Sequence, residues 1–199
     1  MMRKIVNGKS EMHQHHYTAV DPSMPSGNKP TTSLVYEGTP DIEKLITKES
    51  PKQILSEDFP KHDWPISGGW GYTQENAVVV EADNEFDGVG LEYKFLEYRS
   101  YEEAIIFRPK GSRLAGFRFE RVMQSLIHGD DGRSYDRVIM KVIAFNEADF
   151  DYLKNDWESH NAYDGDEDGK QKHLELADSK KIQYEVCGWF DITKFYEKG

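Results

Sequence analysis

The chain has 199 residues, of which 37% are hydrophobic and 13% aromatic, enough apolar material for one sizeable core. Its formal net charge of −11 argues against nucleic acid as a partner, because proteins that bind duplexes are usually basic. A single cysteine, Cys187, excludes an internal disulfide, and no uncharged apolar run reaches the length of about 18 residues that a membrane span needs, so we expect a cytoplasmic protein with no membrane partner.

The first 38 residues are poor in apolar side chains, and they contain three prolines within the segment DPSMPSGNKP. Such a segment buries too little apolar surface to offset the entropy that ordering it would cost. We therefore predict an N-terminal arm or linker at residues 1–38 and a single domain at residues 39–199.

Two short helices are predicted at the start of this domain. The first begins at Thr39 with Pro40 in the next position, and the second begins at Ser50 with Pro51 in the next position. Proline is tolerated there because the first N–H groups of a helix have no partner within the helix. Gln53 is spaced to complete a capping box with Ser50.

Between residues 77 and 145, many apolar residues recur with a period of two, which is typical of β-strands. Val89, Leu91, Tyr93 and Phe95 are expected to share one buried sheet face. Because no long helix separates these segments, we predict an α+β fold: a largely antiparallel sheet of about six strands with a few short helices packed on one side. The predicted strands are AVVVEA, VGLEYKF, EAIIFR, GFRFERVMQSLI, YDRVIMKVIAF and IQYEVCGWFDI.

The segment HGDDGRS has the turn residues of a hairpin loop between the fourth and fifth of these strands. A helix is predicted at NEADFDYLKNDWESH, before the last strand, because Phe150, Leu153 and Trp157 share one helical face. This helix opens an acidic segment, residues 146–178, which contains eleven Asp or Glu and three Lys. Residues 104–121 are instead basic, with five Lys or Arg and one Glu, so the charge is polarised along the chain.

The segment DGDEDGKQKHLE has the ligand spacing of a calcium-binding EF-hand loop, with a glycine at the sixth position. Gln171 stands where such loops prefer an apolar residue, Lys172 places a cation beside the expected ion, and no complete second loop exists to pair with it. A solvated acidic loop is therefore the simpler interpretation. The ligands of the calcium alternative would be Asp164, Asp166, Asp168, the main-chain carbonyl of Lys170, and Glu175.

The glycine-rich segment PISGGWGYT lacks the Gly-Lys-Ser/Thr sequence of a phosphate loop, so it is typical of a turn before a strand. A functional interpretation is that its aromatic side chains form a binding ledge. In the enzyme alternative, a pocket near this turn would use the arginines of the basic segment 104–121 to hold an anionic substrate, together with a carboxylate and His128. The candidate binding residues are Trp64, Trp70, Tyr72, Arg108, Arg113 and Arg118.

No arrangement of nucleophile and base typical of an enzyme is visible, because the histidines are isolated and the carboxylates are too numerous to pair by sequence. We therefore expect a non-catalytic binding protein that uses the acidic surface of residues 146–178 against a basic protein partner, as bacterial immunity proteins do with nuclease toxins. No cofactor is expected, except Ca²⁺ if the loop at residues 164–175 binds it. The alternative is an enzyme of unfamiliar type that acts on an anionic substrate.

Overall fold

The computed structural model describes residues 48–82 and 85–196, all of which fall within one compact unit. The predicted arm at residues 1–38 and the predicted helix at Thr39 lie outside these residues. The predicted domain boundary at residue 39 lies outside them as well and stays a prediction. None of the helices in the two described ranges has the length and apolar content needed to cross a bilayer.

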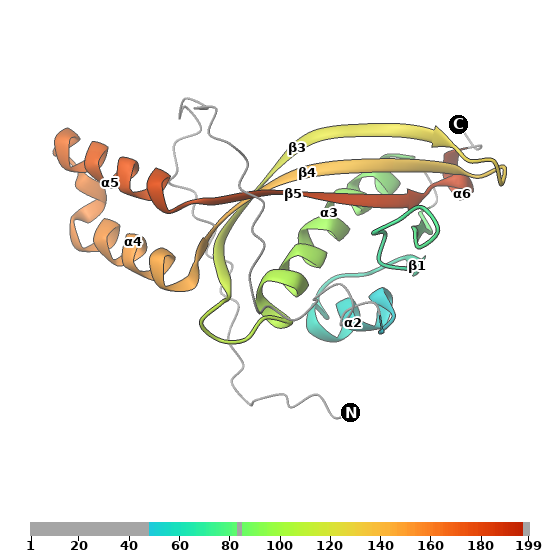
Figure 1. Cartoon of the computed structure of the whole chain (residues 1–199), viewed down its shortest axis with the longest axis horizontal. Helices are drawn as coiled ribbons and strands as arrows, with labels where there is room; N and C mark the ends of the chain where they lie inside the picture. The colour runs from blue at the N-terminus through green and yellow to red at the C-terminus, as the bar shows by residue number, and fades with distance from the viewer. Residues whose placement is uncertain (1–47, 83–84, 197–199) are drawn as a thin grey trace. The chain divides into compact units, whose positions relative to one another are not determined.

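In the described part of the chain, five strands form one sheet in the order β1-β2-β5-β4-β3 (Figure 1). Every neighbouring pair is antiparallel except β2 and β5, which run parallel. The prediction of an α+β fold with a largely antiparallel sheet is therefore confirmed, with five strands in place of about six. The strands are β1 (Ile66–Gly68), β2 (Val78–Val80), β3 (Leu114–His128), β4 (Ser134–Asn146) and β5 (Ile182–Asp191).

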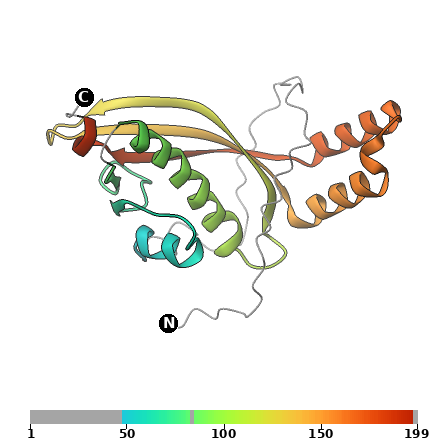
Figure 2. The same cartoon turned by 180° about the vertical axis from the view of Figure 1, so that it is seen from behind.

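Helix α3 lies along one face of the sheet, whereas α4 and α5 lie beyond the ends of β4 and β5 that are far from the β3–β4 turn (Figures 1 and 2). The prediction of a helix between the last two strands is confirmed, and a second helix follows it before β5. The helices of the described residues are α2 (Pro51–Asp58), α3 (Glu85–Tyr101), α4 (Glu147–Ser159), α5 (Glu167–Lys180) and α6 (Thr193–Tyr196), with a π-helical turn η1 (Glu102–Ile106) and a 3-10 turn η2 (Asn161–Tyr163).

The segments VGLEYKF and EAIIFR are helical, so the prediction of two strands there is wrong. The first lies within α3 and the second is largely in η1, which continues the same helix. The expectation that Val89, Leu91, Tyr93 and Phe95 share a sheet face fails with it. Three of these side chains are buried, but they project from a helix that packs against the sheet.

The buried face of α3 repeats every three or four residues, which is the helical period. It passes through Leu91, Phe95 and Leu96, and it also carries ionisable side chains at Glu92 and Arg99. Polar residues at buried positions break the apolar pattern of a helix, and the remaining apolar residues happen to alternate. The sequence pattern therefore resembled a strand because the helix buries charge.

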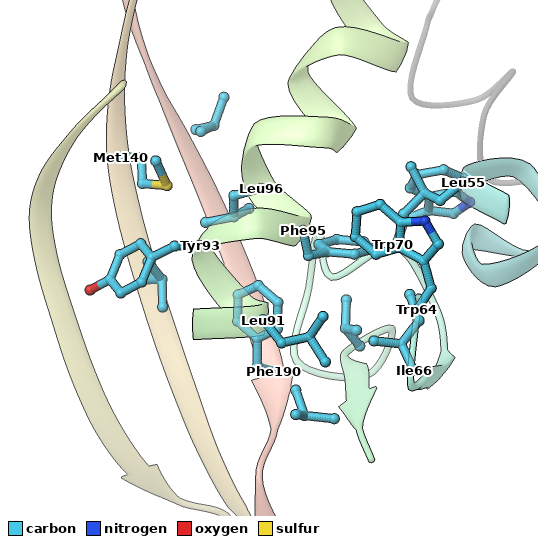
Figure 3. Packing of buried hydrophobic residues seen from close by; sticks show 14 of the residues in the cluster. Leu55, Trp64, Ile66, Trp70, Leu91, Tyr93, Phe95, Leu96, Met140 and Phe190 are labelled. Carbon is cyan, nitrogen blue, oxygen red and sulfur yellow. The ribbon is translucent and has the colours of Figure 1, made fainter. Parts of the chain in front are cut away.

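The main core lies between α3, the sheet and α2 (Figure 3). Phe95 packs edge-on against Phe190 of β5, with ring centroids 5.8 Å apart. Leu96 meets β5 at Gly188, where a Cβ atom would lie 2.6 Å from the Leu96 Cδ2 atom. Glycine is therefore required at this point of β5 for α3 to approach the sheet.

Helix α2 begins after Ser50 as predicted, with Pro51 in its first turn. The predicted capping box is wrong, because the Ser50 side chain makes no capping hydrogen bond. Gln53 instead donates its amide N–H to the Glu57 carboxylate one turn later, at 2.9 Å. Exposed side-chain pairs of this spacing contribute only a few tenths of a kcal/mol, roughly 0.2–0.5. The helix is held mainly by burial of Ile54 and Leu55 in the core.

The predicted hairpin of β3 and β4 is confirmed, and it is the longest pairing in the sheet. Its turn is closed by the Gly129 N–H, which donates to the Arg133 carbonyl at 2.8 Å. The ladder is interrupted twice, between Ala115 and Arg118 and again between Arg121 and Met123. The remaining segment of β3, from residue 123 to the turn, pairs regularly with β4.

Candidate functional site

Helices α4 and α5 form a helical hairpin that carries most of the acidic segment. Leu153 of α4 and His173 of α5 are buried between the two helices. At the base of the hairpin, the Phe150 ring packs over Gly116 of β3, where a Cβ atom would lie 2.5 Å from two carbon atoms of the ring. This contact attaches α4 to the sheet, and only glycine leaves room for it.

A polar cluster around Asp156 ties the two helices together. The His173 Nδ1–H donates to Asp156 Oδ2 at 2.6 Å, and the Tyr163 hydroxyl donates to the same oxygen at 2.7 Å. The hydrogen bond from His173, and then that from Tyr163, lowers the pKa of Asp156 below its usual value. The hydrogen bond that Tyr163 donates to Asp156 also raises the pKa of the Tyr163 hydroxyl to about 12. Asp156 therefore stays ionised and anchors both α5 and the turn between the helices.

The turn between α4 and α5 has an unusual backbone. Asn161, Ala162 and Tyr163 have φ angles of 49°, 56° and 56°, so three consecutive non-glycine residues lie in the left-handed region. Each such residue costs on the order of 1 kcal/mol in a chain of L-amino acids. The Asp156 cluster and the stacking of His160 on Tyr163, with ring centroids 4.8 Å apart, offset this cost and fix the tip of the hairpin.

The outer surface of the hairpin is acidic and carries one exposed aromatic residue. Tyr152 on α4 is 59% exposed, which is unusual for so large a ring. Two lysines of the region pair with carboxylates, Lys154 with Glu158 at 3.9 Å and Lys180 with Asp149 at 3.1 Å. Most of the negative charge remains on the surface, since seven carboxylates of the hairpin are exposed: Asp151, Glu158, Asp164, Asp166, Glu167, Asp168 and Glu175.

The segment at residues 164–175 does not have the conformation of an EF-hand loop. Helix α5 begins at Glu167, so Asp168, Lys170 and Glu175 are helical, and the Asp166 carboxylate accepts a hydrogen bond from the Gly169 N–H as a helix cap. Asp168 and Glu175 are separated by seven helical residues, about 10 Å along the axis, which is too far for two oxygen ligands of one ion. Within residues 48–82 and 85–196, no group of three or more His, Cys, Asp or Glu is placed to hold a metal.

We therefore expect Ca²⁺ and Mg²⁺ at millimolar concentration to shift the melting temperature equally. Glu175→Gln is expected to change the free energy of unfolding by less than about 0.5 kcal/mol, because the Glu175 side chain is exposed and accepts a hydrogen bond from Gln171 one turn earlier. Calorimetric titration with each ion and thermal unfolding of both proteins test this expectation. A saturable calcium isotherm that Glu175→Gln abolishes would instead establish the calcium site.

The aromatic residues of the glycine-rich turn lie mostly in the core. Trp64 and Trp70 are each 1% exposed, and the Trp70 Nε1–H donates to the Glu49 carbonyl at 2.8 Å. Tyr72 is half-buried, and its hydroxyl donates to the Glu103 carboxylate at 2.7 Å. The two tryptophans therefore form no surface ledge in this structure, and their positions give them a packing role.

The basic residues of the enzyme alternative do not converge on His128. Arg113 precedes the first residue of β3, whereas His128 is the last residue of the same strand. Fifteen residues of strand span about 40 Å or more, even allowing for the two irregularities. Arg118, near the start of β3, is exposed and pairs with Glu120, while Arg113 donates its Nε–H to the Arg108 carbonyl at 3.3 Å. The three arginines thus lie far from the histidine expected to join them.

An open hollow of about 440 Å³ lies beside the first turns of α3. Its charged lining residues are Asp63, Glu81, Asp87 and Lys94. Lys94 places its ammonium group 4.6 Å from the centre of the Trp64 ring, and partial burial lowers its pKa. The hollow contains none of the three arginines, so it does not match the anion site that the enzyme alternative requires.

A buried acid pair joins α3 to the sheet, and it was not predicted from the sequence. Glu92 of α3 is 0% exposed and Asp136 of β4 is also buried. Burial, then the charge of Asp136 and a hydrogen bond between the two carboxyl groups, raises the pKa of Glu92 to about 9. Glu92 is therefore protonated at neutral pH and shares its proton with Asp136.

Gln124 of β3 covers this pair. Its side-chain amide donates to Asp136 at 2.5 Å and to Glu92 at 3.3 Å, and its carbonyl accepts from the Tyr93 hydroxyl at 2.9 Å. The two acids are thus enclosed by side chains, which suits a structural network better than a site that must admit a substrate. One signal in the sequence pointed to it: Asp136 is a charged residue at a position where the period-two pattern of β4 expects an apolar one.

No protein family, curated protein or solved structure matches this chain. The function must therefore be argued from the residues of the molecule itself.

Proposed function

We propose that the chain is a non-catalytic binding protein that uses the acidic surface of the α4–α5 hairpin to hold a basic protein partner. The observation that carries this proposal is that the hairpin exposes both Tyr152 and seven carboxylates. Tyrosine is among the residues that contribute most to protein interfaces, and a charged rim accelerates encounter with a partner of opposite charge.

The rigidity of the hairpin supports the same proposal. The Asp156 cluster fixes the angle between α4 and α5, and the strained turn at Ala162 is held by the same contacts. A binding surface that is already ordered loses less conformational entropy when the partner binds. Ordered helices therefore present the carboxylates at fixed positions rather than on a mobile tail.

The proposal is tested by capture from a lysate of the native cell, with the full chain as bait. The expected partner is a basic protein, and its association rate constant should fall at least tenfold between about 50 and 500 mM salt, because surface charge is screened within about 8 Å at physiological ionic strength. The rate constants are measured by surface plasmon resonance. Dissociation should change much less over the same range of salt.

Two variants of equal charge separate the hairpin from the rest of the surface. The first neutralises four hairpin carboxylates: Asp151→Asn, Glu158→Gln, Glu167→Gln and Asp168→Asn. The second neutralises four exposed carboxylates elsewhere: Glu49→Gln, Glu75→Gln, Asp130→Asn and Glu185→Gln. Capture should be lost with the first variant and kept with the second. Equal losses with both would mean that net charge acts and the hairpin does not.

A further inference from the structure

Within residues 48–82 and 85–196, strand β3 lies at an open edge of the sheet, since the strand order ends with it (Figure 1). An edge strand presents unpaired N–H and C=O groups to any chain that can add another strand. The opposite edge is β1, which has only three residues, whereas β3 has fifteen. Strand β3 is therefore the edge that is long enough to pair with a further strand.

The two halves of β3 differ in how they protect this edge. The first half contains Arg118, Glu120 and Arg121, and both irregularities of the ladder fall between Ala115 and Met123. Charges and bulges of this kind are the devices by which edge strands avoid pairing. The sequence VMQSLIH at residues 122–128 has no carboxylate, lysine, arginine, proline or glycine.

This uncharged half also exposes apolar side chains. Val122, Met123 and Leu126 are 51%, 42% and 44% exposed. From Met123 to the turn, every residue of β3 pairs regularly with β4, so the backbone is straight where the charges are absent. A regular, uncharged and partly apolar edge is the kind that pairs with another strand.

The hairpin turn determines which residues of β3 direct their backbone N–H and C=O groups away from β4. The Gly129 N–H donates across the hairpin to the Arg133 carbonyl, and antiparallel residues alternate between facing their partner strand and facing away. Ile127, Ser125 and Met123 therefore direct their backbone groups toward β4. Gln124 and Leu126 direct theirs toward the open edge.

We propose that a second copy of this chain pairs with β3 in antiparallel orientation, through residues 123–127 and with the two-fold axis at Ser125. This register places Gln124 opposite Leu126 of the second copy, and both residues have outward backbone groups, as a hydrogen-bonded pair requires. It places Met123 opposite Ile127 of the second copy, an apolar pair. The two five-stranded sheets become one sheet of ten strands.

The choice of a second copy rests on charge and on self-complementarity. A two-fold axis brings like charges together wherever the segment is charged, and residues 122–128 carry no Lys, Arg, Asp or Glu. Repulsion between the acidic hairpins is weak in this arrangement. The hairpin joins the sheet near Leu114, eleven residues from Ser125 and so about 30 Å away or more, well beyond the screening length of about 8 Å.

A cysteine at the proposed axis tests the pairing directly. In a Cys187→Ser background, Ser125→Cys places two thiols opposite each other in a pair whose Cα atoms are about 4.5 Å apart, within the range for a disulfide. The matched control is Ser67→Cys on β1, an exposed serine of the opposite edge. We expect a covalent dimer from Ser125→Cys after mild oxidation, at least tenfold above the yield from Ser67→Cys, on a non-reducing gel.

Sedimentation of the unmodified chain between about 1 and 200 µM gives the second measurement, and a concentration-dependent dimer is expected. Ser125→Lys should abolish it, because the variant brings two lysines together at the axis, while near-ultraviolet circular dichroism shows whether the variant remains folded. A monomer at all concentrations, with no excess crosslinking at Ser125→Cys, overturns the proposal. A dimer that survives in folded Ser125→Lys, or that crosslinks equally through Ser67→Cys, also overturns it.

Discussion

Replacing Arg99 with methionine is expected to lower the free energy of unfolding by about 3–5 kcal/mol, the cost of removing one partner from a buried charged network. Arg99 lies in the last turn of α3 and is 2% exposed. Its two terminal nitrogens donate to the main-chain carbonyls of Trp70, at 2.9 Å, and of Cys187, at 2.7 Å. Its Nε lies 3.1 Å from the Glu103 carboxylate.

Methionine fills a similar volume but donates no hydrogen bond. Two carbonyls from distant parts of the chain would lose their donors, and Glu103 would lose its cation. The guanidinium group also lies 4.5 Å from the centre of the Tyr72 ring, a contact that methionine replaces only in part. Urea unfolding at pH 7 measures the loss.

The control for this prediction is Arg118→Met. Arg118 is exposed and pairs with Glu120, so its replacement should change the free energy of unfolding by less than about 0.5 kcal/mol. Arg99→Lys keeps the charge but cannot bridge two carbonyls. Its loss in free energy of unfolding should therefore lie between those of Arg99→Met and Arg118→Met. An Arg99→Met protein as stable as the unmodified chain would show that α3 is held by apolar packing alone.

Glu92→Gln is expected to raise the free energy of unfolding at pH 8 by about 1–3 kcal/mol and to flatten its dependence on pH. The pKa of Glu92 is raised to about 9 in the folded chain, mainly by burial and then by Asp136. The ordinary pKa of a glutamate, which applies to the unfolded chain, is 4.5. Between these values the folded chain holds a proton that the unfolded chain releases. The protonated carboxyl therefore contributes fully below about pH 4.5, and its contribution is lost as the pH rises toward 9.

This linkage makes the free energy of unfolding fall with rising pH, by at most about 1.4 kcal/mol per pH unit for one group. Glutamine is neutral at every pH, and its amide can donate to Asp136 in place of the shared proton. It loses only the long 3.3 Å hydrogen bond from Gln124. Urea unfolding of both proteins at half-unit steps from pH 5 to 9 gives the two slopes.

The comparison uses the difference between the two slopes, because other groups also titrate over this range. Glu175→Gln on the exposed face of α5 serves as the control and should leave the slope unchanged. Identical slopes for Glu92→Gln and the unmodified chain would mean that Glu92 and Asp136 do not share a proton in the folded state.

The sequence by itself determined the elements whose signals are local. The turn residues at 128–134 specified the hairpin of β3 and β4, the apolar run AVVVEA specified β2, the segment IQYEVCGWFDI specified β5, and Ser50 with Pro51 marked the start of α2. Phe150, Leu153 and Trp157 identified α4 in the same way. Each signal acts within a few residues, through backbone geometry or through one amphipathic face, so no distant segment was needed to interpret it.

In the acidic segment, too, some features were predicted from the sequence and others depended on the structure. Its charge and its helical character were predicted, whereas the spacing of an EF-hand loop turned out to span a helix cap and two turns of α5. A pattern of ligand types fixes the order of the side chains along the chain, but the backbone conformation decides whether they meet. The Asp166 carboxylate instead accepts a hydrogen bond from the Gly169 N–H in the first turn of α5, which is the ordinary role of an aspartate at that position.

Only the tertiary structure decided the conformation of residues 85–106 and the place of the buried acids. An ionisable residue is stable in a core only when a partner is buried with it, and the partners of Glu92 and Arg99 lie on other segments: Asp136 on β4, the carbonyl of Cys187 on β5 and the carbonyl of Trp70 before β2. The sequence of α3 gives no sign of those partners. Its buried face therefore does not look apolar in the sequence, because Glu92 and Arg99 occupy buried positions on it. Long-range contacts turned a segment with the alternation of a strand into the central helix of the fold.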